Sequence, residues 1–240
     1  MKNPFRSHIL PRFPIISGII GFLLRIWLFS SADAKGLLPS NHFANVSLYV
    51  LSAIVMLVLF LSTRKLTPRR ISKHSIRISS TYSYMLGGLG LALNAAYLLA
   101  HSTAKLTGLA VAASLVGTLI MVYMAFLCFA YKRIPYAFFV SVSIIIILQI
   151  IAQCQIWGTE PQLQKYFFPM MASIFLLLSA YYRTLLAARR PVAQRLAFFS
   201  QAAVYFCILS LNTPQWMFYC GMLFWAASQI YPCTYYKRKV

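Results

Sequence analysis

Acidic residues are almost absent from this chain of 240 residues, which contains only Asp33 and Glu160 against twenty-two lysines and arginines. A single aspartate excludes intramembrane proteolysis by paired aspartates, and a two-carboxylate glycosidase would have to use Asp33 and Glu160 together. The HExxH, GxSxG and P-loop motifs are missing as well. An enzyme would have to take its base or nucleophile from Tyr, Ser or His residues in no recognisable arrangement, so the sequence favours a protein that is not an enzyme.

The sequence also lacks the patterns that hold metals and cofactors. Its five cysteines are scattered, with no CxxC motif and no Cys/His cluster at zinc spacing. No paired histidines suggest haem or iron, and no long apolar run contains the lysine that a retinal Schiff base requires. We therefore expect no cofactor and no metal, and we interpret the cysteines as small apolar packing residues.

Long apolar runs are abundant. The chain is 60% apolar with a mean hydropathy of +0.72, whereas soluble globular domains are about 45 to 50% apolar. The net charge of +20 falls in short segments between apolar runs rather than in a stripe on a soluble domain, which argues against nucleic acid as a partner. The composition predicts an integral membrane protein.

A helix that crosses a bilayer needs about 20 apolar residues. The sequence offers eight such segments and no convincing domain boundary, so we predict an all-α bundle forming one transmembrane domain over residues 1–240. The expected spans are about 13–31, 45–62, 79–100, 107–130, 136–157, 167–187, 196–211 and 215–231.

The basic residues alternate between the connections and thereby predict an orientation. With the amino terminus inside, eighteen lysines and arginines fall on the inner side and three on the outer side, with Arg25 inside the membrane. Because basic loops stay in the cytoplasm, we expect both termini there. The inner segment from Thr63 to Arg77 carries six of these charges, which would also attract anionic lipids or an acidic protein partner.

A second interpretation concerns the first apolar segment. It follows a basic leader and ends in Ala32-Asp33-Ala34, a pattern that a signal peptidase cleaves. Cleavage would leave seven helices and an outside amino terminus. The length of the leader and the interruption by Arg25 favour an uncleaved first helix.

Arg25 is the most unusual residue of the predicted spans, because a charged side chain there costs about 2.5 to 3.5 kcal/mol and usually faces a cavity or a partner. One interpretation is an outward-facing pocket in which the guanidinium binds an anion. The other is a structural lock, in which Arg25 snorkels or pairs with Asp33 or Glu160, both expected on the outer side.

Two glutamines add to the candidate pocket. Gln149 and Gln153 lie four residues apart and therefore on one helical face, where amides either cross-link helices or line a polar pocket. His42, on the outer side, would titrate near neutral pH or simply be solvated. The candidate pocket is thus lined by Arg25, Gln149 and Gln153 and flanked by Asp33, His42 and Glu160.

Small residues follow one face of the third segment. Ser79, Ser83 and Gly87 are spaced by four residues, with Gly88 and Gly90 beside them, and such stripes let helix backbones approach closely. We expect this face to pack against the fourth segment, with a homodimer seam as the alternative. The run from Leu86 to Gly90 would otherwise break the helix and free backbone groups for a ligand.

The first fifth of the chain resembles a group of bacterial multi-pass membrane proteins of unknown activity. The likeness lies in Leu24-Arg25-Ile26-Trp27, followed by Asp33-Ala34-Lys35-Gly36-Leu37-Leu38-Pro39 and His42. The resemblance implies a bacterial inner-membrane location and a first outer loop tied to the first helix. It supplies neither a substrate nor a mechanism.

Two functions remain open from the sequence. The first is a non-enzymatic protein that binds or passes a small molecule through the outward-facing pocket. The second is an accessory or scaffold subunit of a membrane complex, which would dock a partner through the small-residue face of the third segment and the basic inner loops.

Overall fold

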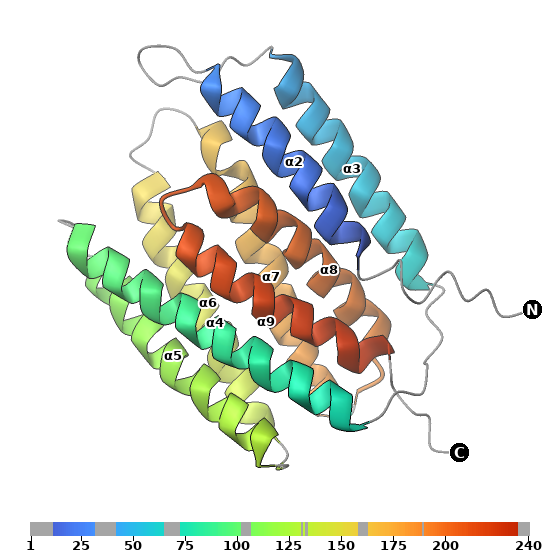
Figure 1. The fold of residues 1–240 in the computed structure, drawn as a ribbon, viewed down its shortest axis with the longest axis vertical. Coiled ribbons are helices and arrows are strands. Elements are labelled where there is room, and N and C mark those ends of the chain that lie inside the picture. The colour runs from blue at the N-terminus through green and yellow to red at the C-terminus, as the bar shows by residue number, and fades with distance from the viewer. Residues whose placement is uncertain are drawn as a thin grey trace, which may run out of the picture.

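The computed structural model describes residues 12–31, 42–64, 73–101, 107–130, 132, 134–157, 163–188 and 190–234. These residues form eight α-helices and two short 3₁₀-helices, without a strand among them (Figure 1). The elements are α2 (Phe13–Ser30), α3 (Phe43–Arg64), α4 (Lys73–His101), α5 (Thr107–Phe129), α6 (Tyr136–Trp157), η1 (Leu163–Tyr166), α7 (Phe167–Ala187), α8 (Ala193–Leu209), η2 (Ser210–Asn212) and α9 (Trp216–Thr234).

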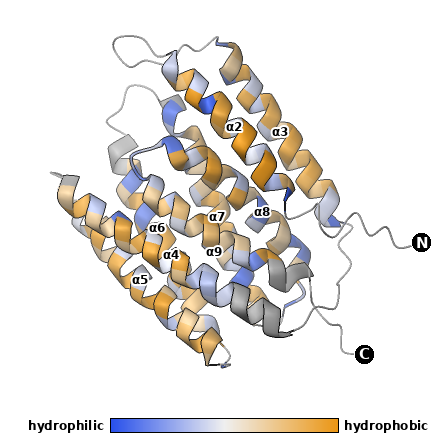
Figure 2. Ribbon diagram, in the orientation of Figure 1, coloured by the Kyte–Doolittle hydropathy of each residue, from blue (hydrophilic) through white to orange (hydrophobic). Residues whose placement is uncertain are grey.

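The predicted all-α membrane bundle is confirmed. Seven helices, α2 to α8, are long and apolar enough to cross a membrane, and hydrophobic residues extend along most of their length (Figure 2). Each predicted span coincides with one helix. The largest difference is at α4, which begins at Lys73 rather than at residue 79, because a helix continues beyond the apolar run that hydropathy detects.

Successive helices run in opposite directions, so the bundle has two ends (Figure 1). Arg25 lies near the last turn of α2 and Arg183 near the last turn of α7. Since α2 and α7 run in opposite directions, these two residues mark opposite ends, called here the Arg25 end and the Arg183 end. α2 begins at the Arg183 end, and α9 ends there.

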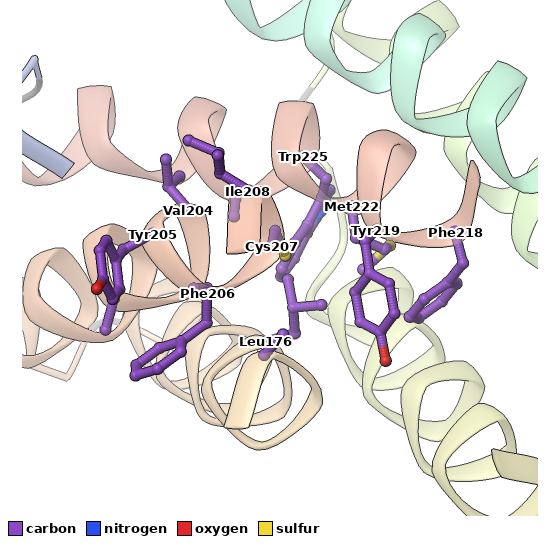
Figure 3. Packing of buried hydrophobic residues seen from close by; sticks show 14 of the residues in the cluster. Leu176, Val204, Tyr205, Phe206, Cys207, Ile208, Phe218, Tyr219, Met222 and Trp225 are labelled. Atoms are coloured by element: carbon purple, nitrogen blue, oxygen red, sulfur yellow. The ribbon is translucent and has the colours of Figure 1, made fainter. Parts of the chain in front are cut away.

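α8 is the central helix of the bundle. Of its membrane-spanning window 72% is buried, against 28 to 44% for the other six candidate spans, and it contacts α2, α3, α7 and α9. Around it, Cys207 lies beside Leu176 of α7 and Trp225 of α9 (Figure 3). The rings of Phe175 and Phe206 stack with centroids 5.2 Å apart. Because lipid tails are as apolar as these side chains, close packing rather than hydrophobic burial holds the helices together.

Glycines permit a close backbone contact between α4 and α9. A Cβ atom at Gly221 would lie 2.9 Å from the carbonyl oxygen of Gly87 and 2.9 Å from the Cα of Gly90. Gly88 instead faces α5, where a Cβ would lie 3.3 Å from Met121. The expected packing on the fourth segment therefore applies to Gly88, whereas Gly87 and Gly90 pack on α9.

Two further expectations about the small-residue face do not hold. The helix is not broken between Leu86 and Gly90, because α4 is continuous. The face is also not a free dimer seam at Gly87 and Gly90, since α9 covers both. Ser83 is half-buried in α4, and the side chain of Ser79 lies outside the described part of the structure.

Five helices close into a ring beside α8. α4 contacts α5, α5 contacts α6, α6 contacts α7, and α9 contacts both α7 and α4. The middle of this ring is filled with apolar side chains that are at most 1% exposed, contributed by all five helices: Leu91, Met121, Ile146, Leu176 and Met222. Polar side chains gather on either side of this apolar middle.

Candidate functional site

Arg25 is held inside the bundle by backbone carbonyl groups. Its side chain is only 2% exposed. Nη1 donates to the carbonyl oxygen of Leu209, the last residue of α8, and Nη2 donates to that of Lys165 in η1 at 2.9 Å. The guanidinium therefore bridges the junction of α8 and η2 to η1, and two backbone carbonyls take up its donors in an apolar environment.

Aromatic rings complete the surroundings of Arg25. Its guanidinium carbon lies 5.4 Å from the ring centroid of Phe29 and 5.5 Å from that of Phe168, within the range of a cation–π interaction. Asp33 and Glu160, the expected carboxylate partners, lie outside the described residues. Arg25 thus links α2 to the ends of α8 and η1, which resembles the structural lock more than an open anion site.

His42 has a structural role at the start of α3. Its Nδ1 accepts a hydrogen bond from the backbone N–H of Ala44 at 3.2 Å, and its carbonyl accepts from the backbone N–H of Asn45 at 2.9 Å. Its ring also packs edge-on against Trp27 of α2, with centroids 5.4 Å apart. These contacts cap α3 and fix it to α2.

Gln149 of α6 belongs to a group of hydrogen-bonded polar side chains inside the five-helix ring. Its Nε2 donates to the carbonyl of Ala110 at 2.8 Å and to Oγ of Ser114 at 2.7 Å. Nδ2 of Asn94 donates to the same hydroxyl at 3.0 Å. Ser114 of α5 therefore joins α4 to α6, and all three polar side chains are at most 2% exposed.

Gln153 belongs to a second such group, one turn further along α6. Its Oε1 accepts a hydrogen bond from the hydroxyl of Tyr219 in α9 at 3.0 Å. Ser173 of α7 lies beside both, with its Oγ 3.3 Å from the Tyr219 hydroxyl and 3.0 Å from the carbonyl of Pro169. The two glutamines share one face of α6 as predicted from their spacing, but they contact different helices.

Together these side chains form a polar layer across the ring at the Arg25 end. Each lies within eight residues of the helix terminus at that end, about 12 Å at a rise of 1.5 Å per residue. All five helices of the ring contribute to it. We define the polar layer as Asn94, Ser114, Gln149, Gln153, Ser173 and Tyr219.

Two amide atoms of the polar layer have no hydrogen-bond partner among the described residues, Nε2 of Gln153 and Oδ1 of Asn94. Gln201 of α8, outside the ring, has neither amide atom paired there and is likewise fully buried. A buried polar atom without a partner costs about 1 to 3 kcal/mol. Such atoms are expected where a water molecule or another small polar molecule supplies the missing bond.

The Arg25 contacts and the polar layer adjoin each other through α7. Phe168 packs on the guanidinium of Arg25, and the next residue, Pro169, has its carbonyl 3.2 Å from the hydroxyl of Tyr219. Within the described residues, however, the hydrogen bonds of Arg25 go to Leu209 and Lys165, and Arg25 does not bond to either glutamine. Arg25, Gln149 and Gln153 thus lie at one end of the bundle but do not line a common open pocket.

An open hollow of about 270 Å³ lies elsewhere, on the outer surface between α5 and α6. Its walls are mainly apolar side chains, including Leu109, Val116, Ile144 and Leu148, and its polar contribution comes from Ser141. None of the predicted site residues is part of these walls. The hollow therefore has the chemistry of a lipid-facing surface.

Sequence reasoning missed several residues of this region. Ser114, Ser173 and Tyr219 are of types common in membrane helices, and nothing in their spacing distinguishes them. Arg183 is one of the eighteen cations counted on the inner side, although it falls within the predicted span 167–187. In the structure it belongs to α7 and its guanidinium carbon lies 4.8 Å from the ring centroid of Phe139, so a count of charges within span boundaries would have found it.

Comparison of the chain with protein-family models, with curated proteins and with solved structures finds no match in any of the three. Function is therefore inferred from the geometry of the bundle.

Proposed function

We propose that the protein is a non-enzymatic membrane protein that binds or passes a small polar molecule within the five-helix ring. The observation that carries this proposal is the polar layer, in which Nε2 of Gln153 and Oδ1 of Asn94 lie buried without partners. One atom donates and the other accepts hydrogen bonds, so together they suit a molecule that has both kinds of group.

The chemistry of the layer narrows the class of ligand. Its six side chains are amides and hydroxyls, and none of them is ionised at neutral pH. A cationic ligand would enter this layer without a counter-charge, which is strongly unfavourable, and the adjoining Arg25 already donates to two backbone carbonyls. The ligand that fits is therefore neutral and polar, and the packed middle of the ring requires that it move past Leu91, Leu176 and Met222 if it is to cross.

We further propose that the Arg25 end faces the exterior and that both termini are cytoplasmic in a bacterial inner membrane. The support is the distribution of charge, since basic residues favour the cytoplasmic side. The cations at the Arg183 end include five exposed side chains: Arg12, Arg64, Lys132, Arg190 and Arg195.

Reporter fusions test this orientation. Alkaline phosphatase, which is active only outside the cytoplasm, is expected to be inactive when fused after Lys132 and active when fused after Lys165. A cytoplasmic fluorescent reporter at the same two positions gives the opposite pattern and serves as the control. Phosphatase activity after Lys132 would contradict the orientation.

Thiol labelling tests access to the polar layer. In a variant whose five native cysteines are replaced by alanine, Gln153→Cys and Asn94→Cys are expected to react with a membrane-impermeant thiol reagent added outside, because a ligand that binds in the layer has to reach it from that face. Leu176→Cys and Met222→Cys are the matched controls in the apolar middle and should stay unlabelled. If Gln153→Cys and Asn94→Cys are labelled no more than the two controls, the proposal is contradicted.

The second candidate is a non-catalytic accessory or scaffold subunit. It is favoured by the exposed cations at the Arg183 end, which suit an acidic partner protein. The small-residue face of α4 cannot serve as its docking surface at Gly87 and Gly90, because α9 covers both residues. Purification in mild detergent separates the two candidates, since a subunit retains a second polypeptide in stoichiometric amount.

A further inference from the structure

Arg183 lies at the opposite end of the five-helix ring, one turn before α7 ends at Ala187. Its side chain is half-buried, with the guanidinium carbon 4.8 Å from the ring centroid of Phe139 in α6. Its Nε is fully buried and has no hydrogen-bond partner among the described residues. The guanidinium therefore retains an unused donor inside the bundle.

The surroundings of Arg183 form a cradle of three helices. Phe139 of α6 provides an aromatic wall that is 1% exposed, and the Tyr84 hydroxyl of α4 lies within reach of the guanidinium. Tyr84 also interacts with Gln229 of α9. Because helical side chains lean toward the amino-terminal end of their helix, Arg183 points into the ring rather than out toward the basic loops.

The part of the chain that the structure describes contains no aspartate or glutamate, so no acidic side chain within it neutralises Arg183. Arg25 has two backbone carbonyls as acceptors, whereas Arg183 has no comparable pair in the described residues.

We propose that the Arg183 cradle binds an oxyanion, namely the phosphate or carboxylate group of a lipid headgroup or of a free solute. A guanidinium presents paired N–H donors that match the two oxygens of such a group, and the Tyr84 hydroxyl is placed to donate a further bond. The exposed Arg190 and Arg195 nearby raise the local concentration of anions.

The depth of the cradle suits this ligand. α7 has 21 residues and is therefore about 31 Å long, which matches the hydrocarbon thickness of a bilayer. One turn from its end, Arg183 lies just below the headgroup level, within reach of a lipid phosphate. This site is separate from the polar layer and does not depend on the function proposed for it.

Thermal unfolding in detergent micelles tests the cradle. The purified full chain is placed in micelles of a maltoside detergent, which carries no phosphate or carboxylate, and inorganic phosphate or phosphatidylglycerol is added in separate series. Each anion that binds is expected to raise the unfolding midpoint of the wild type, because ligands that bind the folded state stabilise it. Arg183→Gln should weaken the apparent affinity about tenfold or more, while Arg64→Gln, which removes an exposed charge at the same end but on α3, should retain it.

The two series identify the source of the anion. Stabilisation by inorganic phosphate that Arg183→Gln abolishes assigns a free solute, and stabilisation only by phosphatidylglycerol assigns a lipid headgroup. Tyr84→Phe keeps the aromatic ring and is expected to weaken anion binding a few-fold. If Arg183→Gln does not fold, this variant tests whether the anion binds at the cradle. Equal responses of the wild type and the folded variants, or no response of the wild type to either anion, would overturn the proposal.

Discussion

Replacing Gly221 by valine is expected to destabilise the bundle by at least about 3 kcal/mol, at the upper end of the cost of overpacking. A Cβ at this position meets the backbone of α4, at the carbonyl of Gly87 and the Cα of Gly90. Backbone atoms cannot rotate away as a side chain can, so α4 and α9 have to separate along their length. The separation would also open the five-helix ring.

Gly108 provides the matched control, because a Cβ at Gly108 meets nothing within 4 Å. Gly108→Val near the start of α5 should therefore change stability only by the difference in helix propensity, a few tenths of a kcal/mol. Unfolding in mixed micelles with increasing amounts of a denaturing detergent measures both variants. Equal stability of Gly221→Val and Gly108→Val would show that α4 and α9 do not make this backbone contact.

Replacing Arg25 by alanine is expected to cost about 3 to 5 kcal/mol. The change leaves the carbonyls of Leu209 and Lys165 without their donor, at about 1 to 3 kcal/mol for each buried acceptor, and it leaves a cavity between Phe29 and Phe168. The affected segments are the ends of α8 and η1, so faster proteolysis around residues 163–166 should accompany the loss of thermal stability.

Two further variants distinguish the reasons for this cost. Arg25→Lys retains the charge but cannot bridge two carbonyls with a planar group, so we expect it to recover only part of the stability. Arg64→Ala is the control for a removed arginine, since Arg64 is exposed and lies 4.2 Å above the ring of Phe60, an interaction that contributes about 0.5 to 1 kcal/mol. A stability of Arg25→Ala equal to that of Arg64→Ala would contradict the structural role of Arg25.

The helices were predictable from the sequence because hydropathy reports the contact of each segment with lipid. The pairing of helices was not, since the same small residues pack equally well on several neighbours. Gly87 and Gly90 illustrate this, because the adjacent segment was the expected partner and α9 is the observed one. A stripe of small residues indicates that a helix can approach another closely, but it does not specify which helix.

The candidate site was predictable only in part, for a related reason. Arg25, Gln149 and Gln153 stand out as polar residues in apolar runs, and their shared end of the bundle follows from the alternation of helix direction. Their partners did not stand out, because Ser114, Ser173 and Tyr219 acquire their role from the helices opposite. The acceptors of Arg25 are backbone carbonyls, which every residue carries, so no side-chain pattern could indicate them.

The enclosure of α8 bears on how the chain is made. This helix has the lowest mean hydropathy of the seven candidate spans, 1.2, and it carries the buried Ser200 and Gln201. Its neighbours α2, α3 and α7 all precede it, so they have already left the ribosome when it emerges. During synthesis, α8 is therefore the helix that partitions least readily into the bilayer on its own, but three helices that contact it are already present. Moving α8 to the amino terminus by circular permutation would remove these contacts at the moment when the translocon inserts α8.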